Sequence, residues 1–491
     1  MHLHAATTFE CSGTLIGAGL VGTFHEWRSG DNERRDEQLG LRRERIVRTP
    51  SAIWITENQE APHEVTGTGS KRRIVQDFDD SEAFTRGAKD IHFVDRERLP
   101  DGRFAYRLMI QSRDGAPFDV LIDSINWLVD EESYSALDGS HEAITFSEYR
   151  VVDGVLVPYI RVDSRGGSEP DVVSTVTKVI VGAPIADSTF VPLERAVVEV
   201  DKPVSVPLEI LSGFPFAIVT IDGKNYRFIV DSGSQANVVD EKVAAALGVS
   251  PVGTFEVSGA KSLASQGIVA LPPLHLGPLT LPSYDAAVLD LHEVMQSSIP
   301  IDGVLGYPFF ASAEVRIDAS GQNMTVARPG SLSGGGLRLP VDIENNRPEI
   351  DGAIDRVSVK LLLDTGNTNE LLVFRNFVEA HPGLVEFSQV GTIRDQAIGG
   401  SMRAFGAYVD EIELGPERLY NRLANVIFAT SGTFADANVA GNVGFGSLRQ
   451  YVATFDLVNH AVYLQHSPTF NDGRGRIRAN PADQVIPQRR S

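Results

Sequence analysis

Short runs of alternating apolar and polar residues, separated by turn-forming residues, recur along most of the chain. Such alternation puts every second side chain on one face and is typical of half-buried β-strands. In the first 200 residues the clearest runs are 21–27, 52–55, 104–110, 118–123 and 144–147. Asp114-Gly115 and Asp153-Gly154 lie between such runs and predict hairpin turns. The pattern therefore predicts antiparallel β-structure in this part of the chain.

Two later stretches share one pattern. Residues 228–234 read FIVDSGS and residues 361–367 read LLLDTGN, so an apolar run leads each time into aspartate, a hydroxyl residue and glycine. Asp231 and Asp364 are 133 positions apart (364 − 231). At this offset Val206-Pro207-Leu208 aligns with Leu339-Pro340-Val341, Pro215 with Pro348, and Asp222 with Asp355. Self-similarity in two copies predicts two similar lobes rather than a solenoid.

Each copy continues with a second glycine signal. Residues 301–306 read IDGVLG and end 75 positions after Asp231 (306 − 231). Residues 440–444 read AGNVG and end 80 positions after Asp364 (444 − 364). A strand-like run containing an aspartate follows each signal, at Asp318 and at Asp456. We therefore expect the duplication to extend over residues 204–465.

Together these motifs resemble those of the aspartic proteases of the retropepsin-like and pepsin-like superfamily. The chain looks most similar to bacterial tandem-lobe members with an extra N-terminal domain. In that family each lobe supplies an Asp-Ser/Thr-Gly loop and a hydrophobic-hydrophobic-Gly segment beside it. The resemblance implies a catalytic pair, Asp231 and Asp364, with loop support from Ser232, Gly233, Thr365 and Gly366 and loop-packing glycines Gly306 and Gly444. Asn367 and Asn442 depart from the family pattern, because Asn442 occupies an apolar position.

The chemistry explains why these residue types are needed. Two carboxyl groups about 3 Å apart share one proton. The ionised group takes a proton from water, and the protonated group hydrogen-bonds the scissile carbonyl. The hydroxyls of Ser232 and Thr365 are suited to link the two loops, and Gly233 and Gly366 permit tight turns. This mechanism uses no metal or cofactor, and we expect neither.

Composition narrows the function further. The 491 residues carry a formal net charge of −21, with 42% hydrophobic and 22% charged residues, as in soluble globular proteins. The negative charge argues against nucleic acid and anionic membrane surfaces as partners. No apolar run approaches the ~20 residues that span a bilayer, so we expect no transmembrane segment. The single Cys11 excludes an intramolecular disulfide and a multi-cysteine zinc site.

The N-terminal strands, above all residues 148–158, resemble the antiparallel half-barrel of bacterial lipoprotein-carrier-like domains. That resemblance implies an apolar ligand in this domain, and Trp27, Trp54 and Trp127 are candidates to line its cavity or to fill its core. We predict a mostly β chain: an N-terminal carrier-like antiparallel β domain at 1–195, protease lobes at 196–330 and 337–466, and a disordered tail at 467–491. Within the lobes we expect a helix at 238–247 that stops at Gly248, and a flap hairpin at 257–269.

The start of the chain is not typical of a signal peptide, because residues 1–23 lack a basic region followed by an apolar core. Relatives of this type look exported. We therefore expect a periplasmic or secreted protein if an upstream signal is missing from this start, and a cytoplasmic one otherwise.

The sequence predicts an aspartic endopeptidase that acts on polypeptides. Both aspartates lie in one chain, so we expect an active monomer. The alternative is an inactive protease fold that binds peptides or a lipid; Asn367 and Asn442 count toward it, and the presence of both aspartates counts against it. A third arrangement would give each lobe its own homodimeric partner.

Overall fold

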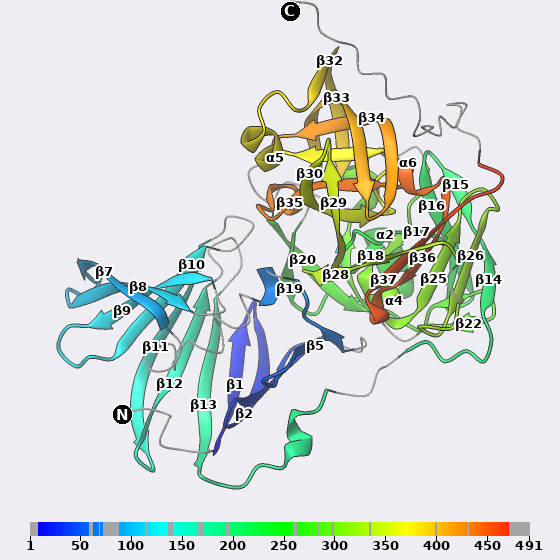
Figure 1. Ribbon diagram of the computed structural model, residues 1–491. Coiled ribbons are helices and arrows are strands. Elements are labelled where there is room, and N and C mark those ends of the chain that lie inside the picture. Colours follow the sequence, from blue (N-terminus) through cyan, green and yellow to red (C-terminus); the bar gives the residue numbers. More distant parts are fainter. Residues whose placement is uncertain are drawn as a thin grey trace, which may run out of the picture.

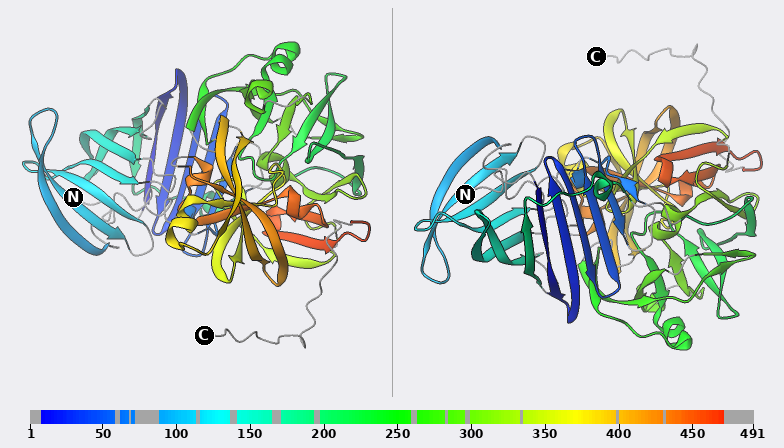
Figure 2. Two further views of the ribbon diagram at one scale, coloured as in Figure 1. Left: turned by 90° about the horizontal axis from the view of Figure 1, so that it is seen from above. Right: turned by 90° about the horizontal axis from the view of Figure 1, so that it is seen from below.

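The computed structural model describes residues 8–470 except 58–61, 68, 72–87, 113–115, 136–140, 165–170, 193–196, 259–262, 282–283, 296–298, 333–334, 398–399 and 430–431. A curved N-terminal sheet stands beside two β-rich lobes (Figures 1 and 2). The predicted mostly β fold class is confirmed. No helix within the described ranges has the length and apolar character needed to cross a membrane.

In the described residues the N-terminal domain is one 13-stranded sheet whose neighbours all pair antiparallel, in the order β6-β5-β4-β3-β2-β1-β13-β12-β11-β10-β9-β8-β7. Its strands are β1 (Thr8–Gly17), β2 (Leu20–Ser29), β3 (Asn32–Leu39), β4 (Arg42–Arg48), β5 (Ile53–Glu57), β6 (His63–Glu64), β7 (Ala88–Arg98), β8 (Phe104–Ser112), β9 (Pro117–Asp123), β10 (Val129–Ser135), β11 (His141–Val152), β12 (Val155–Ser164) and β13 (Val172–Val181).

Sequence pattern accounts for these strands. Alternation along β1 buries Phe9, Cys11 and Leu15 on one face. The β11–β12 hairpin turns at Asp153 and Gly154, both at positive φ, as its Asp-Gly pair predicts. The turn predicted at Asp114-Gly115 lies outside the described residues, although β8 and β9 pair antiparallel on either side of it.

Each lobe has its own sheet. The first contains β15 (Glu209–Leu211), β16 (Phe214–Ile221), β17 (Lys224–Val230), β18 (Asn237–Asp240), β19 (Thr254–Ser258), β20 (Leu263–Ala270), β21 (His275–Leu276), β22 (Leu279–Thr280), β23 (Asp285–Leu289) and β24 (Gly303–Leu305). The second contains β28 (Asp342–Glu344), β29 (Arg347–Ile354), β30 (Val357–Asp364), β31 (Leu371–Phe374), β32 (Glu386–Ala397), β33 (Gly400–Leu414), β34 (Glu417–Ile427) and β35 (Val439–Gly444).

Helices are short in both lobes. Among the described residues of the lobes the α-helices are α2 (Glu241–Leu247), α3 (Leu291–Met295), α4 (Tyr307–Ser312), α5 (Arg375–Ala380) and α6 (Phe445–Leu448), and the 3-10 turns are η4 (Thr433–Ala435) and η5 (Leu457–Asn459). The 3-10 turn η3 (Asp187–Phe190) precedes lobe one.

A third sheet joins the lobes. Its order is β14-β26-β25-β36-β37-β27, with β14 (Val204–Pro207), β25 (Glu314–Asp318) and β26 (Asn323–Ala327) from lobe one. Lobe two contributes β27 (Leu337–Pro340), β36 (Tyr451–Asp456) and β37 (Ala461–His466). At the centre β25 pairs with β36, for example Val315 with Phe455. The buried ring of Phe455 lies 5.4 Å from that of Phe310, so one apolar core is continuous across both lobes.

Several local expectations need correction. The helix predicted at 238–247 begins only at Glu241, because Val238 and Val239 pair with β23 and β24 as a strand. Asp240 then caps the helix and Gly248 ends it at φ 69°, as expected. Trp127 neither fills the core nor lines a cavity, because it is 68% exposed at a turn. The predicted tail falls largely among residues 471–491, which are outside the described chain.

The N-terminal domain contacts the two lobes through the end of β5 and the residues that follow it. Ser70 Oγ donates a hydrogen bond to Glu344 Oε1, and Asn346 Nδ2 donates to Glu57. The His63 ring packs edge-on against Tyr307. His63 belongs to β6, so these contacts tie the N-terminal sheet to both lobes.

We predict that Phe455→Ala destabilises the two-lobed unit by about 3–5 kcal/mol, because it leaves a cavity where the two lobes share their core. Urea unfolding followed by far-UV circular dichroism measures the change in the free energy of unfolding. Phe93→Ala is the matched control, since Phe93 is 64% exposed and its loss should cost less than about 0.5 kcal/mol. Equal losses for the two variants would contradict a shared core.

Candidate active site

The two Asp-Ser/Thr-Gly loops follow buried strands of the two lobes. Phe228 and Val230 before Asp231, and Leu361 and Leu363 before Asp364, are fully buried. Each strand lies parallel to the strand that carries the second glycine signal, so Val230 is beside Leu305 and Asp364 is beside Gly444. The two motifs noted in each half of the sequence are therefore neighbours in space.

The loops hold one another across the lobe boundary. Ser232 N donates to Thr365 Oγ1 (2.9 Å), and Thr365 N donates to Ser232 Oγ (3.1 Å). Each hydroxyl then donates to the other lobe: Ser232 Oγ to Leu363 O (2.8 Å) and Thr365 Oγ1 to Val230 O (2.7 Å). Both side chains are fully buried, so these reciprocal bonds fix the two loops relative to each other.

This arrangement brings the two carboxyl groups together. Asp231 Oδ1 accepts from the backbone N–H groups of Gly233 (2.9 Å) and Ser234 (3.1 Å). Asp364 Oδ1 accepts in the same way from Gly366 (2.8 Å) and Asn367 (3.1 Å). A hydrogen bond also joins the two carboxyls.

The glycines of the triplets are required by close approach. A Cβ on Gly233 would lie 2.3 Å from Asp364 Cγ, and one on Gly366 would lie 2.1 Å from Asp231 Cγ. Both distances are far too short for two carbon atoms that are not bonded to each other, so only glycine fits at these positions. Each glycine therefore leaves room for the carboxyl of the other lobe.

Gly306 and Gly444 lie against the backs of the two loops. A Cβ on Gly306 would be 2.2 Å from Ala236 O, and one on Gly444 would be 2.2 Å from Asn369 O. In addition, Gly306 N donates to Asn237 Oδ1 (2.9 Å), and Gly444 N to Glu370 O (3.2 Å). The structure thus brings the eight residues predicted for the catalytic pair, its loop support and its loop-packing glycines into one assembly.

The pKa of Asp231 differs from that of an ordinary surface carboxyl. Burial, together with the charge of Asp364 and the hydrogen bond to it, raises the pKa of Asp231 well above its usual value. The pair consequently binds a proton at pH values where an isolated aspartic acid is ionised.

Sequence reasoning missed what Asn367 and Asn442 do. Asn442 Nδ2 donates to Asp364 Oδ2 (2.6 Å), and Asn367 Nδ2 donates to Asn442 Oδ1 (3.1 Å). Asn442 is 1% exposed and occupies the place that Val304 takes in lobe one, beside β17. The sequence shows Asn442 as an asparagine at an apolar position, but it does not show that Asn442 contacts Asp364.

The hairpin at the predicted flap position, 257–269, is β19–β20, and lobe two has a hairpin of its own at β32–β33. The turn at 259–262 and Gly399 at the second turn lie outside the described residues. Among the residues that are described, no group of three or more His, Cys, Asp or Glu is placed to hold a metal ion.

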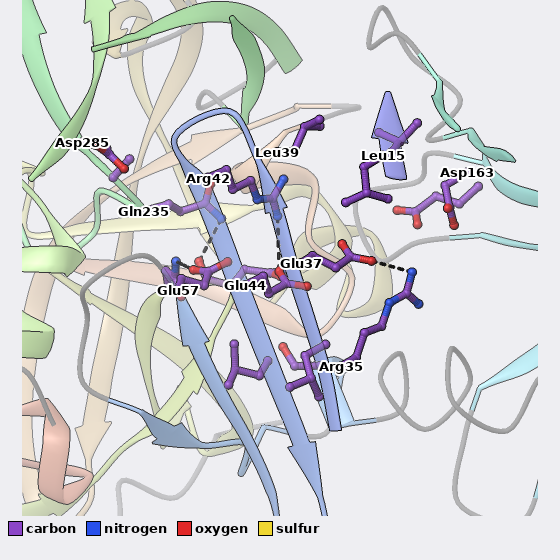
Figure 3. A pocket seen from close by; sticks show the side chains of 18 of the residues that line it. Leu15, Arg35, Glu37, Leu39, Arg42, Glu44, Glu57, Asp163, Gln235 and Asp285 are labelled. Atoms are coloured by element: carbon purple, nitrogen blue, oxygen red, sulfur yellow. Dashed lines mark hydrogen bonds and ion pairs between the residues drawn. The ribbon is translucent and has the colours of Figure 1, made fainter. Parts of the chain in front are cut away.

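A separate cavity of about 440 Å³ lies between the N-terminal sheet and both lobes, and neither Asp231 nor Asp364 lines it. Figure 3 shows Leu15, Leu39 and the charged Arg35, Glu37, Arg42 and Glu44 on its walls. The charges are paired, as in Arg35–Glu37 (2.5 Å) and Arg42–Glu44 (3.4 Å). Gln235, just after the Asp231 triplet, faces the cavity from lobe one.

Comparison with known proteins agrees with this geometry. Residues 217–309, which include Asp231 and Gly306, match the family model described as aspartyl protease. The predicted resemblance is confirmed. The match lies within the first lobe. A search of curated proteins finds no similar sequence.

Solved structures resemble the two parts of the chain at low identity. An aspartic proteinase from Irpex lacteus shares 13% identity with a TM-score of 0.36, over 55% of this chain and 98% of its own. A LolA superfamily protein from Nitrosomonas europaea shares 12% identity with a TM-score of 0.29, over 38% of this chain and 90% of its own. A DUF1329 family protein from Desulfovibrio piger shares 11% identity with a TM-score of 0.30, over 38% and 90%.

Because the pKa of Asp231 is raised, we predict that the effect of this residue on stability depends on pH. Protonated Asp231 favours the fold below the pKa of the unfolded chain, near pH 4, and this stabilisation is lost as pH rises through the higher folded pKa. Asp231→Asn removes the ionisation, so it should raise the melting temperature relative to wild type at pH 7, with a difference that shrinks toward zero near pH 3.

Thermal melts from pH 3 to 7 measure this difference. Asp201→Asn, at an exposed position outside the site, is the control and should leave the melting temperature unchanged across the range. A pH-independent effect of Asp231→Asn would contradict a raised pKa.

Proposed function

We propose that this protein is an aspartic endopeptidase that hydrolyses peptide bonds with a water molecule activated by the Asp231–Asp364 pair. The observation that carries the proposal is the hydrogen-bonded carboxyl pair held by reciprocal Ser232–Thr365 bonds. One carboxyl in such a pair is protonated while the other is ionised, so a general acid and a general base are both present at one place.

Two features favour hydrolysis over a protein that only binds peptides. Buried carboxyls in contact repel each other and are costly to the fold, and a binding surface has no need of them. A glycine faces each carboxyl, and its missing side chain is what allows the two carboxyls to come into contact. Asn442, which counted toward the binding alternative, donates a hydrogen bond to Asp364 and so leaves the pair intact.

The same contacts support action as a monomer. The loops of the two lobes bond to each other within one chain, and the lobes share a central sheet. A homodimer that paired equivalent lobes would have to break these bonds. One site per chain is therefore the simpler arrangement.

We predict that wild-type protein cleaves an unfolded protein mixture between pH 3 and 7, and that Asp231→Asn and Asp364→Asn each lower the rate by at least about 100-fold. Cleavage products are followed by mass spectrometry on the monomer fraction from size exclusion. Asp201→Asn, outside the site, should cleave like wild type. No cleavage by well-folded wild type at any pH would contradict the proposal, and half-activity in each variant would indicate two independent sites.

The cavity favours a second candidate function in the N-terminal domain. Its volume of about 440 Å³ is in the range of small-molecule sites. Ile46, Ile55 and Leu39 supply apolar walls, and the paired charges of Arg42 and Glu44 lie next to them. We propose a ligand with both an apolar and a polar part, rather than a wholly apolar one.

We predict that a bound molecule co-purifies with the intact chain and that Ile46→Arg, which places a charge on the apolar wall, removes it. Native mass spectrometry after gentle purification detects the added mass. Ile218→Arg, at an exposed site on lobe one, is the control and should retain the ligand. A native mass of wild type equal to that of the polypeptide alone would contradict this candidate and leave the protease proposal unaffected.

A further inference from the structure

Four asparagine side chains form a continuous hydrogen-bond chain that ends on Asp364. Asn425 Nδ2 donates to Asn369 Oδ1 (2.8 Å), and Asn369 Nδ2 donates to Asn367 Oδ1 (3.0 Å). Asn367 Nδ2 then donates to Asn442 Oδ1 (3.1 Å), and Asn442 Nδ2 donates to Asp364 Oδ2 (2.6 Å). Every amide donates in the same direction, toward the carboxyl.

A backbone group fixes this direction. Asn369 N donates to Asn367 Oδ1 (2.9 Å), and a backbone N–H can only donate, so that side-chain atom must be the oxygen. The Nδ2 of Asn367 therefore points to Asn442, which must present its own oxygen there. The remaining amide group of Asn442 consequently offers an N–H, and not an oxygen, to Asp364.

Both oxygens of Asp364 are thus acceptors. Oδ1 receives the N–H groups of Gly366 and Asn367, and Oδ2 receives Asn442. Three N–H donors on one carboxyl favour its ionised form.

Asp231 lacks the third donor. Its Oδ1 receives two backbone N–H groups, but in the described part of the chain no side-chain amide reaches its Oδ2. The position equivalent to Asn442 is the buried Val304, and Ser234, which corresponds to Asn367, donates to Ala236 O instead (2.8 Å). The two lobes therefore differ in the number of N–H groups that they donate to their aspartate, and this difference bears on which aspartate holds the shared proton.

We infer that the chain Asn425–Asn369–Asn367–Asn442 holds Asp364 as the ionised member of the pair and leaves the shared proton on Asp231, with Asn442 as the positioning residue. Its catalytic meaning rests on the proposed function. Asp364 then takes a proton from water as the water oxygen bonds to the scissile carbonyl carbon, and Asp231 gives its proton to the carbonyl oxygen. The C–N bond of this tetrahedral diol then breaks as Asp364 gives its proton to the leaving nitrogen and one hydroxyl gives its proton to Asp231. A carboxylic acid and an amine are released, and the starting protonation of the pair is restored.

In the part of the protein that the structure describes, few charged groups lie near the four asparagines. From lobe one, Asp231 faces Asp364 directly. On β34, Arg422 pairs with Glu370 at 3.9 Å, beside Asn369 and Asn425, and Glu370 also accepts from Leu423 N. The strand that carries Asn442, β35, has no charged residue. The direct charged neighbour is thus the other aspartate, so a pH effect of Asn442 reports on the pair.

The test is Asn442→Val, which copies Val304 of lobe one. Loss of one N–H donor to a carboxylate should make the ionised form harder to reach, so the acidic limb of the kcat/KM profile moves to higher pH by about one to two units. At a pH on that limb the loss is about 10- to 100-fold. The substrate is a quenched peptide built around a bond that the wild type cleaves.

Asn367→Ser, which copies Ser234, is the second variant and covers the case in which Asn442→Val fails to fold. It removes the group that orients Asn442 but keeps Asn442 itself, so the limb should move in the same direction by less. Asn376→Ala is the matched control, because this asparagine of the same lobe donates to the carbonyls of Asp436, Ala437 and Val439. It should leave the limb in place.

A measurement without substrate separates this inference from the proposed function. A bond to an ionised acceptor stabilises the fold only when Asp364 is ionised, so Asn442→Val should lower the melting temperature more at pH 7 than at pH 3. In an Asp364→Asn background that pH dependence should disappear. A loss equal at all pH values, or a limb that does not move in an active enzyme, would overturn the inference. Inactive wild type with the expected melting profile would refute the protease proposal alone.

Discussion

The site depends on the reciprocal bonds between Ser232 and Thr365. Each residue uses its backbone N–H and its hydroxyl to bond to the opposite loop, and both are fully buried. Removing either hydroxyl would leave a buried N–H of the other lobe without its acceptor, and an orphaned buried group costs about 1–3 kcal/mol. These bonds hold two carboxyls in contact despite their mutual repulsion, and the shared core around Phe310 and Phe455 keeps the lobes from separating.

The two similar lobes place one carboxyl each at the site, and a local difference between the lobes distinguishes the two carboxyls. Hydrolysis needs one protonated and one ionised carboxyl, and two identical lobes would not specify which is which. The asparagine chain on lobe two and Val304 on lobe one provide a difference at matching places. The direction of that chain is set by a single backbone donor, Asn369 N. An apparent defect in the family pattern is thus accounted for by a contact with the carboxyl itself.

Much of this assembly could be predicted from the sequence, because the residues that define it are local and occur twice. Apolar runs before Asp231 and Asp364 predict buried strands, and glycine after each hydroxyl residue predicts close approach. The Asn442 contact could not be predicted, since its partner is 78 positions away and asparagine is otherwise a turn residue. The contact between the N-terminal sheet and lobe two could not be predicted from the sequence either, because Ser70 and Glu344 are 274 positions apart. The start of α2 was misplaced because Val238 and Val239 fit a helical spacing but are held by two neighbouring strands.

The central claim is that one chain contains one site built from both lobes. A peptide analogue with a secondary alcohol in place of the scissile amide mimics the tetrahedral intermediate and should bind both carboxyls at once. Calorimetric titration of the purified monomer should give one molecule bound per chain, with binding lost in both Asp231→Asn and Asp364→Asn. Two molecules per chain, or binding that survives in either variant, would contradict a shared site.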